Sequence, residues 1–193
     1  MEIDLPIEVH PWEPFIPAGA KVLIMGTFPP QSKRWSMDFY YPNATNDFWY
    51  MMGLIFMGDR RALIDESSGR FNLAAIKRLL TERGIALSDT GRRIRRLKGN
   101  ASDKFLEILE PVDLQGLLDR MPDCHTVVTT GEKAADVVAS LTGTEAPRMG
   151  TMTPGPGGLS IWRMPSTSRA YPLKLEAKAD YYRRMFEAAG ILI

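Results

Sequence analysis

The chain has 193 residues, of which 45% are hydrophobic and 24% charged, and this composition is typical of one globular domain whose core needs no disulfide or metal ion. A single cysteine, Cys124, excludes an internal disulfide framework and indicates a reducing compartment such as the cytoplasm, while two histidines leave too few ligands for a structural zinc site. The N-terminus lacks the basic start and apolar stretch of a signal peptide, and no apolar run approaches the roughly 20 residues that cross a bilayer. The net charge of +1 neither requires nor excludes a nucleic-acid partner.

The N-terminal segment is rich in proline. Its four prolines, spaced between positions 6 and 17, forbid a helix and favour an extended chain. Apolar side chains such as Trp12 predict that this segment packs on the body of the protein. Since no linker divides the rest of the sequence, we expect residues 1–193 to form a single domain, with residues 1–20 as a packed extension.

Short apolar runs alternate with segments of helical periodicity. The first run, KVLIMG at residues 21–26, is continuous and ends at a glycine, which is typical of a strand buried on both faces. This pattern and three similar runs predict strands at residues 21–26, 84–88, 125–131 and 159–164. The helical patterns predict helices at residues 47–57, 71–83, 104–109, 114–121, 131–141 and 173–189. The alternation indicates an α/β fold with a mostly parallel sheet, and the Pro and Gly content of residues 151–158 predicts a loop.

The fold class suggests where a site would lie, because ligands of parallel α/β sheets bind beyond the carboxyl ends of the strands. The candidate segments are residues 27–32, Asp89, residues 131–133 and residues 165–170. The first of these, TFPPQS, lacks the glycine pattern of common phosphate-binding loops. It is either a rigid turn without function or a turn whose backbone amides face a ligand.

Residues 38–49, DFYYPNATNDFW, are dense in aromatic and amide side chains. The last two aromatic residues are expected in the core. Tyr40, Tyr41 and Asn46 are expected on the loop side, where a ring can stack on a nucleobase and an amide can orient water or read a base edge.

Two further segments have side chains that suit phosphate. Residues 91–104, GRRIRRLKGNASDK, carry five basic residues within seven positions, and these either contact phosphates or form a solvated charged face. Residues 164–170, MPSTSRA, carry three hydroxyls that either bind phosphate oxygens or cap the last helix. The basic residues are Arg92, Arg93, Arg95, Arg96 and Lys98.

Together these segments resemble the uracil-DNA glycosylase superfamily, in an order similar to that of the mismatch-specific thymine/uracil and hypoxanthine-DNA glycosylases. KVLIMGTFPP resembles the first motif, a strand followed by Gly-x-x-Pro, and FYYPNATNDFW resembles the aromatic block that ends in Asn-x-Phe-Trp. VVTTGEKAADV resembles the third strand with its Gly-Lys/Gln-Ala turn, and WRMPSTSRA resembles the Pro-Ser-x-Ser motif. The resemblance covers residues 20–190 and implies a three-layer α/β/α fold with a short four-stranded parallel sheet.

The resemblance also implies an activity, which is to flip a damaged base out of DNA and to hydrolyse its N-glycosidic bond without a metal or another cofactor. Tyr41 matches the aromatic residue that stacks on the flipped base. Asp89 falls where uracil-specific enzymes place the asparagine that reads the base edge.

The Pro-Ser-x-Ser motif implies contacts with the DNA backbone. Ser166 and Ser168 match the hydroxyls that bind the phosphates, with the hydroxyl of Thr167 between them. Arg169 and Tyr171 match the stretch that wedges into the space left by the flipped base.

Two departures from the family pattern affect the mechanism. Uracil and mismatch enzymes carry Asp or Asn in the first motif to position the attacking water. This chain has Phe28 at that place, and the hypoxanthine branch is also apolar there. The resemblance therefore transfers the water-positioning role to Asn46, in the Asn-x-Phe-Trp block. Asp89 accepts hydrogen bonds but cannot donate to O4 of uracil unless it is protonated, so it suits a base edge that offers donors. Asp38 is an alternative general base, and the backbone amides of Thr27 and Phe28 could stabilise the departing base.

The resemblance therefore implies a metal-independent, monofunctional DNA glycosylase of base excision repair, which acts as a monomer on DNA with a damaged or mismatched base. The alternatives are a non-catalytic DNA-binding protein of the same fold and a nucleoside or nucleotide hydrolase. The charge of +1 is then expected to average one positive face, formed by the arginines near residue 95, with acidic residues such as Glu107 and Glu110 elsewhere.

Overall fold

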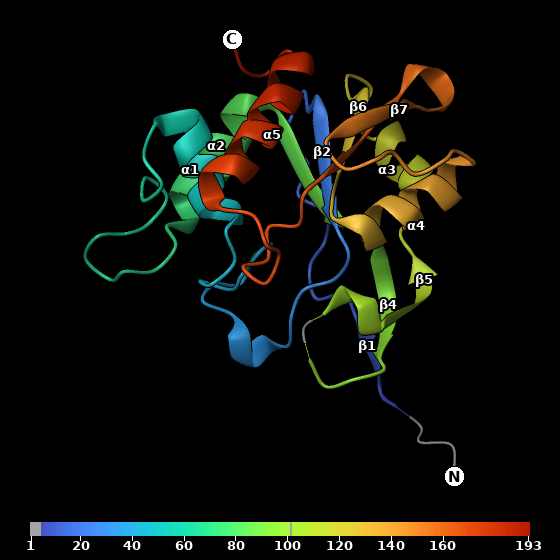
Figure 1. Ribbon diagram of the computed structural model, residues 1–193, viewed down its shortest axis with the longest axis horizontal. Helices are drawn as coiled ribbons and strands as arrows, with labels where there is room; N and C mark the ends of the chain where they lie inside the picture. The colour runs from blue at the N-terminus through green and yellow to red at the C-terminus, as the bar shows by residue number, and fades with distance from the viewer. Residues whose placement is uncertain (1–4, 101) are drawn as a thin grey trace.

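The apolar runs form a central sheet in the computed structural model, which describes residues 5–100 and 102–193 (Figure 1). The parallel strands are β2 (Val22–Gly26), β3 (Ile85–Asp89), β6 (Thr126–Thr130) and β8 (Ser160–Met164), in the spatial order β3-β2-β6-β8. Every residue of β2, β3 and β6 is buried, as continuous apolar strands require when helices cover both faces of a sheet. The four predicted parallel strands are therefore confirmed.

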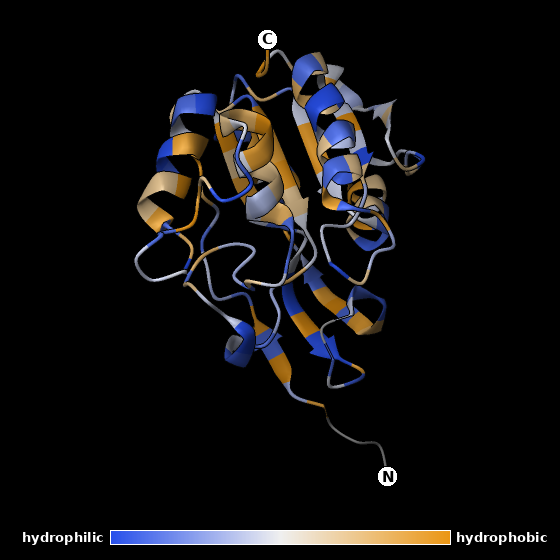
Figure 2. Ribbon diagram, turned by 60° about the vertical axis from the view of Figure 1, so that its left-hand side comes forward, coloured by the Kyte–Doolittle hydropathy of each residue, from blue (hydrophilic) through white to orange (hydrophobic). Residues whose placement is uncertain are grey.

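The helices form an outer layer on each face of the sheet (Figure 1). One layer consists of α1 (Phe48–Met57), α2 (Leu73–Arg83) and α5 (Leu175–Ala188), and the other of α3 (Leu114–Asp119) and α4 (Glu132–Thr142). Alternate residues of β2 point into two separate cores, Ile24 toward the first layer and Leu23 toward the second. Figure 2 shows the apolar strands between helices that carry polar residues on their outer sides. This arrangement is the predicted three-layer α/β/α fold.

The ends of α2 follow from its flanking residues. The side chain of Asn72 accepts a hydrogen bond from the backbone N–H of Ala75 at 3.0 Å and caps the first turn. Gly84 ends the helix in the left-handed conformation, with φ +67°, and a Cβ there would lie 3.1 Å from the carbonyl oxygen of Gly19. Among the described residues, no helix is long and apolar enough to cross a membrane.

Two predicted elements are wrong. Part of the expected loop at residues 151–158 is strand β7 (Thr151–Pro154), which pairs antiparallel with β8 as an edge strand, where a proline is tolerated. The expected helix at residues 104–109 is instead a short 3-10 turn, η2 (Asp103–Phe105), followed by strand β5 (Leu106–Pro111). Pairing with a neighbouring strand outweighs the local helical pattern there.

The N-terminal segment belongs to a second, antiparallel sheet. This sheet has the order β1-β4-β5, with β1 (Ile7–Val9) and β4 (Gly91–Arg96). Further along the segment, Phe15 and Leu87 exchange two backbone hydrogen bonds of 2.9 Å, which tie it to β3. The described part of the extension is thus extended and pairs with β4 and β3, while residues 1–4 lie outside the described residues.

Candidate active site

Polar side chains meet beyond the carboxyl ends of the parallel strands. Thr27 directly follows β2, Asp89 ends β3 and Thr130 ends β6, and all three are buried. Because β2 lies between β3 and β6 in the sheet, these three side chains are brought to one place. This place is the edge at which the sequence predicted a site.

The approach of these side chains depends on Gly26, the last residue of β2. A Cβ on Gly26 would lie 2.8 Å from Asp89 Oδ1, 3.3 Å from Tyr41 Oη and 3.4 Å from Thr130 Oγ1. A larger residue would therefore push the carboxylate and the two hydroxyls apart. Gly26, the glycine of the Gly-x-x-Pro motif, is therefore needed for space at the centre of the site.

Tyr41 lies against this centre, whereas Tyr40 does not. Tyr41 has an uncommon φ of +52°, its ring stacks on Phe48 with centroids 3.8 Å apart, and its hydroxyl shares a hydrogen bond of 3.0 Å with Thr130 Oγ1. Burial raises the pKa of Tyr41 far above its ordinary value, so the phenol stays neutral. Phe48 covers one face of the ring, so only the other face could stack on a base. Tyr40 was expected on the loop side but is buried, and its hydroxyl donates to the carbonyl oxygen of Glu13.

Asp89 has a partner that the sequence analysis missed, His10. The His10 Nε2 and Asp89 Oδ2 atoms lie 2.8 Å apart, and the two side chains are 1% and 8% exposed. Phe28 packs edge-on against the imidazole, with ring centroids 5.3 Å apart. The N-terminal segment therefore supplies a side chain to the site, although the family resemblance began only after it.

A second carboxylate, Asp103, was also missed. Its Oδ2 accepts a hydrogen bond of 3.0 Å from the hydroxyl of Thr27. The pKa of Asp103 is raised to about 6, chiefly by burial and also by the nearby charge of Asp89, while the hydrogen bond from Thr27 opposes the rise. A carboxyl group that titrates near neutrality thus lies beside the turn that follows β2.

This raised pKa predicts a pH-dependent cost to stability. An aspartate in the unfolded chain ionises near pH 3.8, whereas Asp103 in the folded protein ionises near pH 6, so the folded state loses stability as the pH rises between these values. Asp103→Asn keeps an acceptor for Thr27 but cannot ionise. We expect its free energy of unfolding to exceed that of the wild type by about 1–3 kcal/mol at pH 7.5 and to match it near pH 3.5. Urea unfolding at both pH values measures this difference.

The matched control for that measurement is Asp123→Asn, at an exposed aspartate. It should leave the pH dependence of unfolding as in the wild type. Parallel curves for wild type and Asp103→Asn would contradict the assigned pKa.

Asn46 precedes α1, and its side chain supports the start of that helix. Its Oδ1 accepts a hydrogen bond of 2.9 Å from the backbone N–H of Phe48. An amide oxygen has two lone pairs, so the same atom can still accept from a water molecule. Asp38, the alternative base, is exposed, and its Oδ1 accepts from Trp12 Nε1 at 2.6 Å.

The segment after β8 offers hydroxyls. The Oγ atoms of Ser166 and Ser168 each accept a hydrogen bond of 3.2 Å from a backbone N–H two residues later, which leaves their O–H groups free to donate. Thr167 between them is buried, whereas Arg169 is exposed and Tyr171 is partly so. The Thr167 carbonyl accepts from the backbone N–H of Asp47 at 2.9 Å, and this bond joins the segment to α1.

A buried ion pair, also missed, strengthens this junction. Lys178 in α5 is completely buried, and its Nζ donates to Asp47 Oδ2 and to the carbonyl oxygen of Ser168, both at 2.9 Å. Arg169 Nε donates to the other carboxylate oxygen, Asp47 Oδ1, at 3.0 Å. A sequence signal was present, because Lys178 falls on the apolar stripe of its helix between Leu175 and Tyr182.

The prediction that the arginines form one positive face, with the acidic residues elsewhere, is wrong. Strand β4 pairs antiparallel with β5, which places its arginines opposite glutamates, and the remaining arginines pair with the N-terminal segment. The pairs are Arg92–Glu13, Arg93–Glu110, Arg95–Glu107 and Arg96–Glu8, with N–O distances of 3.8, 3.8, 3.1 and 2.7 Å. Lys98 Nζ lies 4.1 Å from the centroid of the Phe105 ring. The positive face is therefore largely neutralised by acidic neighbours.

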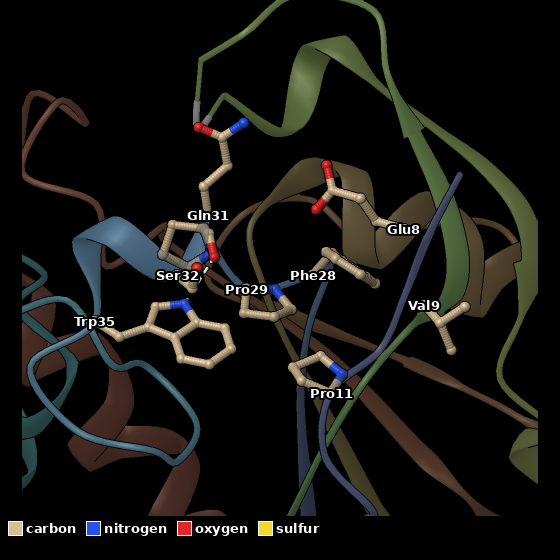
Figure 3. A pocket seen from close by; sticks show the side chains of 9 residues that line it. Glu8, Val9, Pro11, Phe28, Pro29, Gln31, Ser32 and Trp35 are labelled. Carbon is tan, nitrogen blue, oxygen red and sulfur yellow. Dashed lines mark hydrogen bonds between the residues drawn. The ribbon is translucent and has the colours of Figure 1, made fainter. Parts of the chain in front are cut away.

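A pocket of about 270 Å³ lies beside the strand-end site (Figure 3). Phe28, Pro29 and Trp35 line it from the turn after β2, and Val9 and Pro11 line it from the N-terminal segment. Phe28 thus belongs to both features, since its ring edge also packs on His10 in the site. Among the described residues, no group of three His, Cys, Asp or Glu side chains is placed to hold a metal ion.

Comparison with known proteins supports the fold. No protein-family model and no curated protein matches the chain. Among solved structures, it is similar to the solution NMR structure of a protein from Methanosarcina acetivorans that is provisionally assigned as a uracil DNA glycosylase. The TM-score is 0.64, with 22% sequence identity over 94% of this chain and 99% of that chain. The chain therefore shares the fold of that protein, which is the three-layer α/β/α fold that its four sequence blocks predicted, and its assignment to a branch of the uracil-DNA glycosylase superfamily stays a prediction.

Proposed function

We propose that the protein is a DNA glycosylase that flips a damaged, deaminated base out of DNA and hydrolyses its N-glycosidic bond in base excision repair. The observation that carries the proposal is that the loop with Tyr41 and Asn46 is joined to the hydroxyl segment after β8. Asn46 lies next to Asp47, which is bonded to the segment with the phosphate-binding hydroxyls, and the same loop brings Tyr41 to Asp89. Groups suited to a base, to water and to phosphates thus lie on connected segments of one fold.

The chemistry needs three contributions. As the bond from C1′ to the base nitrogen breaks, its electron pair goes to the base, and the sugar becomes oxocarbenium-like before a water oxygen bonds to C1′ and loses its proton. Asn46 Oδ1 accepts from this water and orients it, acting by position because an amide is not an effective base. Backbone amides of Thr27 and Phe28 stabilise the negative charge on the departing base, and Asp38 is the alternative proton acceptor.

The proposed substrate contacts are of two kinds, with the base and with the DNA backbone. Tyr41 stacks on the flipped base and Asp89 accepts a hydrogen bond from its edge. The proposed DNA contacts are Ser166, Thr167, Ser168, Arg169, Tyr171, Arg92, Arg93, Arg95, Arg96 and Lys98. Arg92, Arg93 and Arg95 would exchange a glutamate for a phosphate oxygen. Arg96 is 6% exposed and is also bonded to the carbonyl oxygen of Pro29, so it would have to leave a buried position. The attraction of these arginines to DNA is therefore smaller than the sequence suggested.

One observation favours a second candidate, a non-catalytic DNA-binding protein of this fold. Phe28 stands where uracil and mismatch enzymes place the water-positioning Asp or Asn, and its ring is packed between His10 and the Arg96 guanidinium. A nucleoside or nucleotide hydrolase would use the same strand ends but would not need the hydroxyl segment after β8.

The deciding experiment is a panel of oligonucleotides, single-stranded and double-stranded, that contain uracil, hypoxanthine, xanthine, G·U or G·T. Abasic sites are counted after alkaline cleavage, with undamaged DNA as the control, and the wild-type monomer is expected to release at least one of these bases. Binding without release from any of them would support the non-catalytic protein. Release from free nucleosides but not from DNA would support the hydrolase.

A further inference from the structure

The N-terminal segment carries His10 into the site at a fixed position. Directly after β1, the backbone N–H of His10 donates to the carbonyl oxygen of Arg92 at 2.8 Å, and five residues later Phe15 pairs with Leu87 in β3. The segment is therefore anchored on both sides of His10. Its imidazole is 1% exposed and Nε2 lies 2.8 Å from Asp89 Oδ2.

The hydrogen bonds of His10 allow Nε2 to donate to Asp89. Nδ1 lies 3.2 Å from the backbone N–H of Trp12, from which it can accept, and 2.9 Å from the carbonyl oxygen of Trp12, to which it can donate. In the neutral ring that accepts from Trp12, the proton is on Nε2; in the charged ring both nitrogens carry protons. In either state Nε2–H donates to an ionised Asp89.

Aromatic rings hold the imidazole in this orientation. Tyr40 stacks on it with centroids 5.7 Å apart, and Phe28 and Trp12 meet it edge-on at 5.3 and 5.9 Å. Rotation of the ring away from Asp89 would break this packing. The role of His10 is therefore fixed by geometry as well as by chemistry.

The partnership leaves one oxygen of Asp89 for a ligand. Oδ2 is bonded to His10, while Oδ1 lies toward Gly26, 2.8 Å from the position that a Cβ there would take, and beside Tyr41 Oη. A carboxylate held in this way presents an acceptor and no donor.

We propose that His10 is a positioning residue of the base site, which holds Asp89 so that Oδ1 accepts from an N–H on the edge of the flipped base. This inference rests on the proposed glycosylase function. It makes the preferred substrate a base that presents a ring N–H at that edge, and it gives the N-terminal segment a part in base selection.

Three variants test the inference on the oligonucleotide panel. His10→Phe keeps an aromatic ring but removes the donor, and single-turnover release of the preferred base should fall about 10–100-fold, as for loss of a hydrogen bond to a charged group. His10→Gln offers an amide N–H to Asp89 and should recover most of that loss. In an Asp89→Asn background, His10→Phe should add little further loss, because His10 acts through Asp89.

Equal losses on every base, or equal losses for His10→Phe and His10→Gln, would overturn the positioning role in favour of a structural one. The matched control is His125→Gln, at the exposed histidine, which should leave release unchanged. Thermal unfolding of each variant shows whether it is folded.

A second measurement does not depend on activity. The chain has two histidines, so the imidazole nitrogens of His10 and His125 are readily told apart by ¹⁵N NMR. We expect a protonated Nε2 on His10 in the free protein and a change of its signals, but not those of His125, in Asp89→Ala. Unchanged His10 signals would overturn the inference. If these signals behave as expected but no base is released from any oligonucleotide, the proposed function fails, and the role of His10 in base selection fails with it. The His10–Asp89 contact would still stand.

Discussion

Lys178→Met is expected to lower the free energy of unfolding by about 3 kcal/mol, at the lower end of the cost of breaking a buried ion pair. Methionine fills nearly the same volume, so the loss comes from the charge and not from a cavity. Asp47 would keep one partner, Arg169 at 3.0 Å, but would lose the Lys178 ammonium, and Ser168 would lose a hydrogen bond to its carbonyl oxygen. Urea unfolding at pH 7 measures the effect.

The matched control is Lys174→Met, the same change at an exposed lysine one turn earlier, which is expected to alter stability by less than about 0.5 kcal/mol. Combining Lys178→Met with Asp47→Asn should cost less than the sum of the two single changes, because neither buried charge is then left alone. Equal stability of Lys178→Met and the wild type would mean that the pair does not hold the segment after β8 in place.

Asn46→Ala is expected to lower the rate of base release about 10²–10³-fold, the usual cost of removing one polar group that is positioned for the transition state. The same change removes the acceptor of the Phe48 backbone N–H and should cost about 1 kcal/mol of stability. Affinity for DNA should persist, because the hydroxyl segment after β8 is untouched. Single-turnover release and DNA binding, measured on the same oligonucleotide, separate the two effects.

The control for this prediction is Asn46→Asp, which keeps an oxygen for both the Phe48 N–H and the water. It should retain more activity than Asn46→Ala and nearly the stability of the wild type. Full activity of Asn46→Ala on the base that the wild type releases would show that another group, such as Asp38, orients the water.

Local patterns predicted the regular elements well where burial is uniform. Apolar runs predicted β2, β3, β6 and β8. The signal is clearest in β2, β3 and β6, where every residue is buried, because a strand covered on both faces needs apolar residues throughout. The same reasoning missed β7 and β5, where residues 151–158 looked like a loop and residues 104–109 like a helix. Both strands lie at the edges of their sheets, and strand pairing rather than local composition decides their structure.

The sequence likewise predicted some features of the candidate site and missed others. The sequence predicted its location and Tyr41, Asp89, Asn46 and the hydroxyls after β8 as candidates, because strand order and family motifs are read along the chain. It could not show that the arginines of β4 are paired, since each glutamate partner comes from another strand or segment. The roles of the candidates stay predictions until the variants above are measured.

By itself, the sequence determined the alternation of strands and helices and the edge of the sheet at which polar residues gather, because periodicity is a property of neighbouring residues. The three-layer arrangement followed from the family resemblance of its motifs. Only the tertiary structure decided which side chains become partners. His10 and Asp89 are 79 residues apart in the chain, Thr27 and Asp103 are 76 apart, and Asp47 and Lys178 are 131 apart. Such contacts depend on how distant segments cross in space, and in this protein they orient Asp89, limit the rise in the pKa of Asp103 and anchor the segment after β8.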